Sequence, residues 1–318
     1  LFNFPCAGFG DIIVCKTMYD YLRKWYPHSQ ITLCSTAPGK FRSIGIKDKI
    51  TPIKLKENKG QEIECLDYDK LKVSLPKKFD MMIIIPIINK SFNVKIFRTL
   101  VPYSNMFNTF TMSEYNGEYP PYTFPIGVGD GQLGMLFNDL SVKKQKMIKN
   151  PYSLVYIQPQ PEWGIHSKYC FLSFLEMTCK KYHKHRIFEM IIPEWIEGDL
   201  QHDSPFYYKA MKIVKKYYSN VSIKYPDVDG DEDIVMFVEN QKNNDMFMFR
   251  ADILPQPRET FISLMKGSVQ DILVTGDQSI TDVISCCRNE KNIWYQIAPW
   301  KQDFAYYLSK ELPNKSYE

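Results

Sequence analysis

A short apolar run that leads through a glycine turn into an amphipathic helix constrains the fold most, and it occupies residues 271–287. The apolar run is followed by Gly276, and Ile280, Val283 and Ile284 then recur at helical spacing. This pattern predicts a strand, a tight loop and a helix in direct succession. Such a unit is typical of an α/β protein with a parallel sheet.

The loop of this unit is predicted to present backbone N–H groups and a hydroxyl at the start of a helix, which Ser279 opens. A helix N-terminus carries unsatisfied donors and the positive end of the helix dipole, so it suits a phosphate or diphosphate. The alternative is that Ser279 only caps a helix of an ordinary α/β domain. This stretch alone does not decide between the two.

The beginning of the chain repeats the same alternation. Residues 1–5 are predicted to form a strand, residues 6–11 a loop, residues 12–27 a helix and residues 31–34 a second strand. Gly8 and Gly10 resemble part of a dinucleotide-binding fingerprint, but Ile13 stands where its third glycine would fall. This argues against a nicotinamide or flavin site.

The rest of the chain continues as alternating strands and helices. Further strands are predicted at 79–85, 108–112, 152–157, 187–192, 221–224, 234–238, 246–249 and 292–298, and helices at 141–149, 168–181, 205–218, 258–266 and 302–312. Residues 115–134 are rich in glycine and proline and indicate a seam between two halves. We therefore expect an α/β fold of two facing Rossmann-like domains, 1–140 and 141–318, with a cleft between them.

Composition narrows the class of protein. The net charge of +4 is too small to suggest nucleic acid, although it is compatible with an anionic ligand. No apolar run approaches the roughly 18 residues needed to span a bilayer. The eight cysteines are scattered without a Cys-x-x-Cys pair, which favours reduced thiols and a cytoplasmic location.

Several segments resemble glycosyltransferases of the GT-B fold. Gly10–Ile13 and the helix after it look like the start of heptosyltransferases, and Ser167-Lys168-Tyr169 resembles a helix start in their donor domain. Phe9–Ile12, Ile253–Gln256, Gly276–Ser279 and Ile297–Leu308 are similar to segments of protein-arginine rhamnosyltransferases. The matching segments cover roughly a quarter of the chain in the same order.

The resemblance implies an inverting, metal-independent glycosyltransferase that uses a nucleotide sugar as co-substrate, without another cofactor. Asp11 then corresponds to the general base, and Gly8, Phe9 and Gly10 belong to the acceptor-side loop. A base must be ionised and lie within hydrogen-bond reach of the acceptor, and a helix N-terminus helps to keep Asp11 charged. The alternative is that Asp11 only caps its helix. The acceptor is expected to be a protein or a glycan.

On the donor side the resemblance assigns Gly276, Asp277, Gln278 and Ser279 to the diphosphate. Asp277 and Gln278 replace a Glu-Asp pair of the family, and Thr275 replaces an arginine. Lys168, Arg250 or Arg258 is then expected to supply the missing positive charge, because a leaving diphosphate needs a metal or cationic donors. Gln256 is expected to contact the nucleotide base.

An acidic run at residues 227–233 offers a competing metal site, since Asp229 and Asp231 form an Asp-x-Asp pair. The run does not fit the calcium-loop pattern, and a solvated turn is the simpler interpretation. His183 and His185 flank Lys184 in a basic turn, and His166 is the histidine expected near the cleft.

Two other functions remain open at this stage. The departures at Thr275 and Gln278 are compatible with a GT-B-like protein that has lost turnover and acts as a binding or structural component. A nucleotide-sugar epimerase or hydrolase on the same fold is the third possibility.

Overall fold

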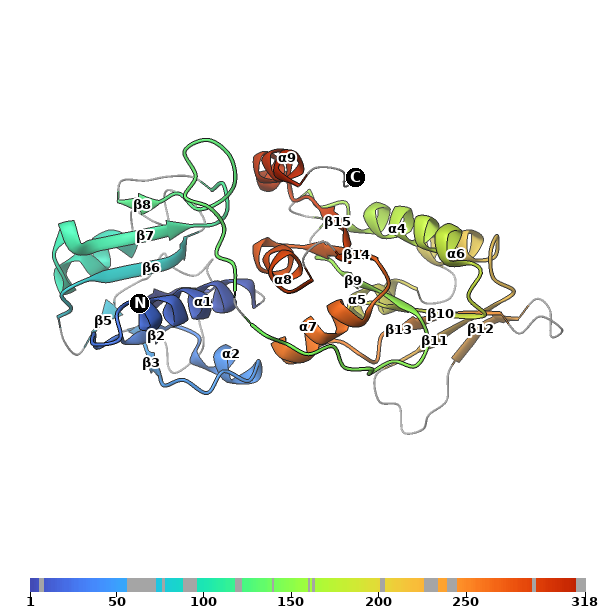
Figure 1. The fold of residues 1–318 in the computed structure, drawn as a ribbon, viewed down its shortest axis with the longest axis horizontal. Helices are drawn as coiled ribbons and strands as arrows, with labels where there is room; N and C mark the ends of the chain where they lie inside the picture. Colours follow the sequence, from blue (N-terminus) through green and yellow to red (C-terminus); the bar gives the residue numbers. More distant parts are fainter. Residues whose placement is uncertain are drawn as a thin grey trace. The chain divides into compact units, whose positions relative to one another are not determined.

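The computed structural model is an α/β protein with two Rossmann-like domains, and each domain is described by itself (Figure 1). It describes residues 1–5, 9–55, 73–75, 78–87, 96–117, 122–138, 140–159, 161, 164–200, 204–225, 234–238, 245–287 and 290–312. The first domain comprises Leu1–Asn138, Asp277–Thr281 and Trp300–Pro313, and the second comprises Asp139–Gly276, Asp282–Pro299 and Asn314–Glu318.

The first domain contains a six-stranded parallel sheet with the order β3-β2-β1-β6-β7-β8. Its strands are β1 (Phe2–Asn3), β2 (Leu33–Ser35), β3 (Ile50–Pro52), β6 (Met82–Ile87), β7 (Thr109–Ser113) and β8 (Thr123–Phe124). Counted along the chain, this is the strand order of the Rossmann fold, which reverses direction between β1 and β6. Ligands of such sheets bind beyond the carboxyl ends of the strands at this reversal.

Helices and a small hairpin complete the first domain. They are α1 (Gly10–Trp25), α2 (Pro38–Ser43), α9 (Gln302–Glu311), the 3-10 turns η2 (Val101–Tyr103), η3 (Met106–Asn108) and η6 (Pro299–Lys301), and the antiparallel pair β4 (Lys54–Leu55) and β5 (Val73–Ser74). Helix α1 buries Ile12, Cys15 and Met18, which recur every three residues and so share one face. Phe2, Phe4 and Ile84 lie in the core of this domain.

The second domain contains a sheet with the order β12-β11-β13-β10-β9-β14-β15, in which only the edge strand β12 is antiparallel. The strands are β9 (Tyr152–Tyr156), β10 (Ile187–Ile191), β11 (Asn220–Lys224), β12 (Ile234–Val238), β13 (Met246–Arg250), β14 (Asp271–Thr275) and β15 (Asn292–Gln296). The crossovers reverse direction between β9 and β14, so this pair marks the ligand-binding edge expected for the domain.

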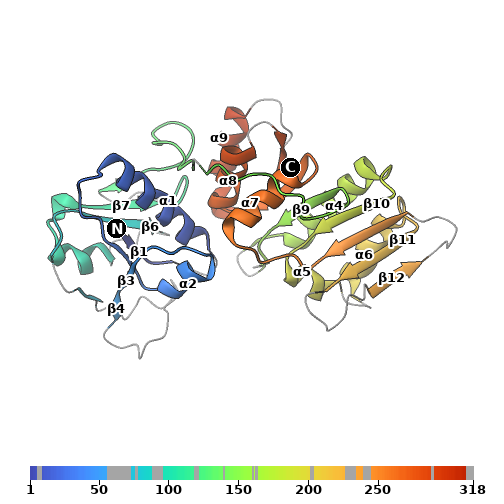
Figure 2. The same cartoon turned by 60° about the horizontal axis from the view of Figure 1, so that its bottom comes forward.

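Helices connect the strands of the second domain within its described residues (Figure 2). They are α4 (Ser167–Tyr182), α5 (Glu194–Asp199), α6 (Pro205–Val214), α7 (Arg258–Gly267) and α8 (Asp277–Cys287), the last of which also contributes its first five residues to the first domain. Phe171, Phe174, Phe188 and Phe247 are fully buried and lie in the core that the helices form with the sheet. These phenylalanines therefore form part of the core of the second domain.

Several details differ from the sequence predictions, and the short elements α2, β3 and β8 were not among the predicted ones. Residues 141–149 form no helix: the segment lacks an apolar stripe, and the Gln145 amide donates instead to the Ser263 hydroxyl. Helix α5 was not predicted, because it is only six residues long. Helix α8 begins at Asp277, two residues before Ser279. Gly276 precedes it with a φ of +77°, a conformation that favours glycine.

The cysteines that lie in the described ranges are all free thiols: Cys15, Cys34, Cys170, Cys179, Cys286 and Cys287. Within the same ranges, no helix combines the length and the hydropathy that crossing a bilayer would require.

Candidate functional site

The reversal point of the first sheet is held together by Asn3, which is fully buried in β1. Its side-chain amide donates to the carbonyl of Asp11 and to the carbonyl of Ile85, both at 3.1 Å. Its side-chain oxygen accepts a hydrogen bond from the hydroxyl of Ser35 at 3.0 Å. One side chain thus fixes the start of α1 against both β2 and β6.

Asp11 is the second residue of α1 and is half-buried. The N-cap is Phe9, which makes no side-chain capping bond, and the helix begins at Gly10. Asp11 is therefore not the N-cap residue of α1. Its carboxylate lies in the first turn, where the helix dipole favours negative charge. Gly8 lies outside the described residues.

The reversal point of the second sheet is organised by Gln296 at the end of β15. The Gln158 amide donates to Oε1 of Gln296 at 2.9 Å, and Nε2 of Gln296 donates to the Gln158 carbonyl at 3.1 Å and to the Ser167 hydroxyl at 3.2 Å. The Thr275 hydroxyl donates to the Gln296 carbonyl at 3.1 Å. These bonds tie the ends of β9, β14 and β15 to the first turn of α4.

Within the predicted donor loop, Gln278 and Ser279 lie in the first turn of α8 and are only 4% and 8% exposed. Thr275, which replaces the arginine of the resembling family, is 4% exposed and bonded to Gln296. Gly276 precedes the helix, and a side chain added there would meet no atom within 4 Å. Residues 275–279 therefore include no cationic side chain.

Asp277 belongs to a buried charged cluster in the first domain. Its Oδ2 accepts from the Lys301 ammonium at 2.8 Å and from the Tyr115 amide at 2.9 Å. Lys301 also lies 2.9 Å from Oε2 of Glu114 and donates to the Tyr115 carbonyl at 3.2 Å. The Tyr115 hydroxyl is 3.0 Å from the Thr281 hydroxyl. Asp277 therefore has a structural role at the start of α8.

Burial and charge act in opposite directions on this cluster. Burial lowers the pKa of Lys301, but Asp277 and Glu114 outweigh it and raise the pKa above that of an ordinary lysine. Burial also raises the pKa of Glu114, the charge of Asp277 adds to that rise, and Lys301 offsets only part of it. Lys301 is consequently held as a cation by its two partners.

Each cation proposed for the diphosphate pairs with a carboxylate. Lys168 is exposed in the first turn of α4 and lies 2.6 Å from Asp199. Arg250 contacts Glu189 and lies 2.7 Å from Asp252, and these partners raise its pKa despite its burial. Arg258, at the start of α7, lies 2.8 Å from Asp282 of α8. Lys168 is the most accessible of the three.

The remaining candidates are dispersed. Gln256 is half-buried beyond β13, and its amide donates to the Ile253 carbonyl at 2.6 Å. His166 is exposed before α4, and His183 and His185 are exposed at its other end. The acidic run 227–233 lies outside the described residues. Among the residues that are described, no group of three or more His, Cys, Asp or Glu side chains could hold a metal ion.

Comparison with known proteins adds no family: no protein-family model matches the chain, and neither the curated proteins nor the solved structures gave a match. The pair of Rossmann-like domains is consistent with a GT-B-like fold.

Sequence reasoning missed the residues that position the site rather than form it. Asn3, Gln296 and Lys301 carry no motif of their own, and Lys301 follows an exposed tryptophan in a segment that looks solvated. A buried amide in a two-residue strand is recognised only when its three partners are placed in space. Spacing along the chain gave no signal for any of the three.

Proposed function

We propose that the protein is an inverting, metal-independent glycosyltransferase that transfers a sugar from a nucleotide-sugar donor to a protein or glycan acceptor. The observation that carries this proposal is the position of the two candidate loops. Each follows a strand at the reversal point of its own sheet, β1 with α1 in the first domain and β14 with α8 in the second. Ligands of Rossmann-like sheets bind at such positions.

In this proposal the first domain supplies the base. The acceptor hydroxyl or amide nitrogen attacks the anomeric carbon while its proton passes to the Asp11 carboxylate. The bond from the anomeric carbon to the diphosphate oxygen breaks, and its electron pair leaves with the nucleoside diphosphate. A positioned base contributes typically 10²–10⁴-fold to such a step. Phe9 and Gly10, at the start of α1, lie on the acceptor side.

The second domain and the α8 start supply the donor site. The backbone N–H groups that follow Gly276 stabilise the leaving diphosphate, because they lie at the N-terminus of α8, which is the positive end of the helix dipole. Lys168 is exposed in the first turn of α4 and pairs with Asp199. When the donor binds, the Lys168 ammonium leaves Asp199 and contacts the phosphate, which adds positive charge to the site. Gln256 contacts the nucleotide base. The buried hydroxyl of Ser279 and the side chains of Asp277 and Gln278 shape the loop.

The test is a thermal-shift titration of the protein with UDP, GDP, TDP and CMP sugars in the presence of EDTA. One donor class should stabilise the protein without a metal. Ser279→Ala and Lys168→Ala should each weaken that donor by about tenfold, which corresponds to about 1.4 kcal/mol. Lys209→Ala, an exposed lysine of α6, is the matched control and should leave donor affinity unchanged. Stabilisation that requires a divalent cation would contradict the proposed mechanism.

A second function is a GT-B-like binding or structural protein without turnover. The observation that favours it is the pairing of Lys168, Arg250 and Arg258 with carboxylates, together with the burial of Thr275 where the resembling family has an arginine. Failure of every nucleotide sugar to stabilise the protein would support this function over transfer.

A further inference from the structure

The second domain carries a concentrated basic surface that the proposed reaction does not use. It lies where α4 leads into β10 and where α6 leads into β11. Its members are exposed lysines and an exposed arginine, and we refer to them as the basic edge: Lys180, Lys181, Lys184, Arg186, Lys212, Lys215 and Lys216. No acidic residue occurs within residues 180–186 or 212–219.

The two connections form one continuous surface. Helices α4 and α6 pack against each other, and the views in Figures 1 and 2 place them on the same side of the sheet. The Tyr218 hydroxyl donates to the Tyr182 carbonyl at 2.9 Å, and the rings of His183 and Tyr217 lie 6.1 Å apart. The cations of both connections therefore lie on adjoining parts of one surface.

Two cations of the basic edge form ion pairs with carboxylates of the same domain. Lys216 lies 2.7 Å from the exposed Glu176, and Lys181 pairs with the buried Asp271. Basic residues at helix C-termini also interact favourably with the helix dipole, which explains one or two of them at each end. A set of seven in two adjoining connections exceeds what capping requires.

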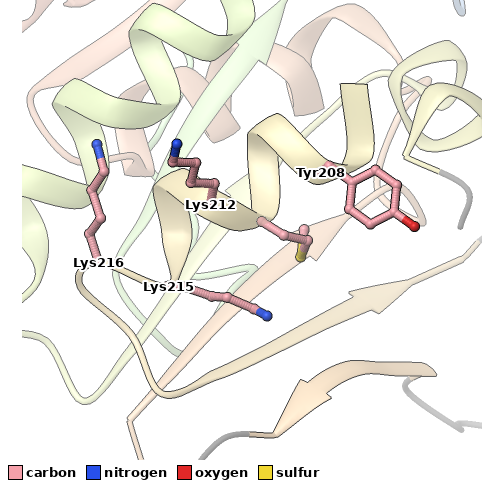
Figure 3. A pocket seen from close by; sticks show the side chains of 5 residues that line it. Tyr208, Lys212, Lys215 and Lys216 are labelled. Atoms are coloured by element: carbon pink, nitrogen blue, oxygen red, sulfur yellow. The ribbon is translucent and has the colours of Figure 1, made fainter. Parts of the chain in front are cut away.

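The direction of the side chains indicates the shape of the partner. Tyr208, Met211, Lys212, Lys215 and Lys216 line a shallow surface pocket. Figure 3 shows Lys212 and Lys216 extending to one side of α6, while Lys215 and Tyr208 extend to the other. Because the ammonium groups diverge, they do not enclose a single phosphate. They suit negative charge spread over a broad area.

We propose that the basic edge docks the protein onto the surface of a bilayer that contains anionic lipids. A cluster of four to eight Lys and Arg residues is attracted to the negative potential of such a surface. Six of the seven are lysines, which act as point charges and lack the bidentate geometry that reading bases or single phosphates favours. The exposed Tyr208 adds an amphipathic ring suited to the lipid headgroup layer.

The topology of the second domain gives this docking a consequence. The basic edge lies at the amino ends of β10 and β11, whereas the candidate donor site lies at the carboxyl ends of β9 and β14. These strands are parallel, so the basic edge and the candidate donor site lie at opposite ends of the strands. Docking at the basic edge therefore does not cover the ends of the strands that carry the candidate donor site.

The test is co-sedimentation of the full chain with vesicles of phosphatidylcholine alone and of phosphatidylcholine mixed with phosphatidylserine. Binding is expected only with the anionic lipid and should fall steeply as salt is raised. Replacing Lys212, Lys215 and Lys216 together by Gln should weaken it about 100-fold, which is about 1 kcal/mol for each lysine. The triple variant Lys180→Gln, Lys184→Gln, Arg186→Gln should weaken it similarly from the other connection.

The matched control replaces three exposed lysines of the first domain, Lys47, Lys49 and Lys78, by Gln, with the same change in net charge. It should bind anionic vesicles nearly as well as the unmodified chain. Equal losses in the control and the α6 variant would overturn the proposal, because overall charge would then explain binding. Absence of vesicle binding together with lysine-dependent binding of a single-stranded RNA oligonucleotide would also overturn it.

Discussion

The ammonium of Lys301 lies 2.8 Å from Oδ2 of Asp277, so a buried lysine at the start of α9 holds the first residue of α8. Glu114 and the backbone of Tyr115 complete the coordination of this ammonium. The residue that the sequence places in the donor loop is therefore part of the architecture of the first domain.

Replacing Lys301 by Met should destabilise the protein strongly, because it leaves Glu114 and Asp277 without their shared cation. Removing one partner of a buried ion pair costs about 3–5 kcal/mol. Chemical denaturation monitored by circular dichroism measures this loss. Lys310→Met, at an exposed position of α9, is the control and should unfold like the unmodified chain. An unchanged midpoint for Lys301→Met would show that the cluster contributes no stability.

Asn3 should affect both stability and turnover, since its amide joins Asp11 to β6. Asn3→Ala removes three hydrogen bonds from a fully buried site and should lower the free energy of unfolding by about 1–3 kcal/mol. It should also lower kcat for donor turnover more than it raises KM, because the start of α1 loses its support. Asn108→Ala, whose amide bonds to a carbonyl at the surface, should change neither kinetic constant.

We expect Lys291 to make the free energy of unfolding change with pH in the alkaline range. Burial lowers its pKa from 10.5 to about 8 in the folded protein. Between these values the unfolded chain binds a proton that the folded chain does not, so this group makes stability rise with pH from about 8 to 10.5. Below that window the folded protein carries the cost of the buried charge.

The measurement is the free energy of unfolding across this pH range for the unmodified chain and Lys291→Met. In Lys291→Met the free energy of unfolding should rise less steeply with pH than in the unmodified chain, whereas Lys47→Met should keep the full rise. Parallel curves for the unmodified chain and Lys291→Met would contradict the assignment.

Much of the fold was predictable from local pattern. The apolar runs at 152–156 and 271–275 become buried parallel strands, and α1 and α4 follow the spacing of their apolar residues. The predicted helix at 141–149 was wrong because its polar residues have no common apolar face. The two Rossmann-like sheets were predicted from the alternation of strands and helices.

The site was less accessible to sequence reasoning. Gly276 indicated a turn in the sequence, because a backbone with a positive φ favours glycine. The carboxylates that pair with the three cations could not be predicted from the sequence, because the fold brings each pair together. The pairs are Lys168 with Asp199, Arg250 with Asp252, and Arg258 with Asp282. Pairing in space decides whether a cation is available, and spacing along the chain does not.

The central claim is that Asp11 acts as a base on a donor held without metal. This is tested by measuring the release of nucleoside diphosphate from the stabilising nucleotide sugar in EDTA, with water as the acceptor of the sugar, for the unmodified chain and for Asp11→Asn. We expect release by the unmodified chain, at least about 100-fold slower release by Asp11→Asn, and the same donor-induced thermal shift for both. Equal release by the two proteins, or no release and no stabilisation with any donor, would contradict it.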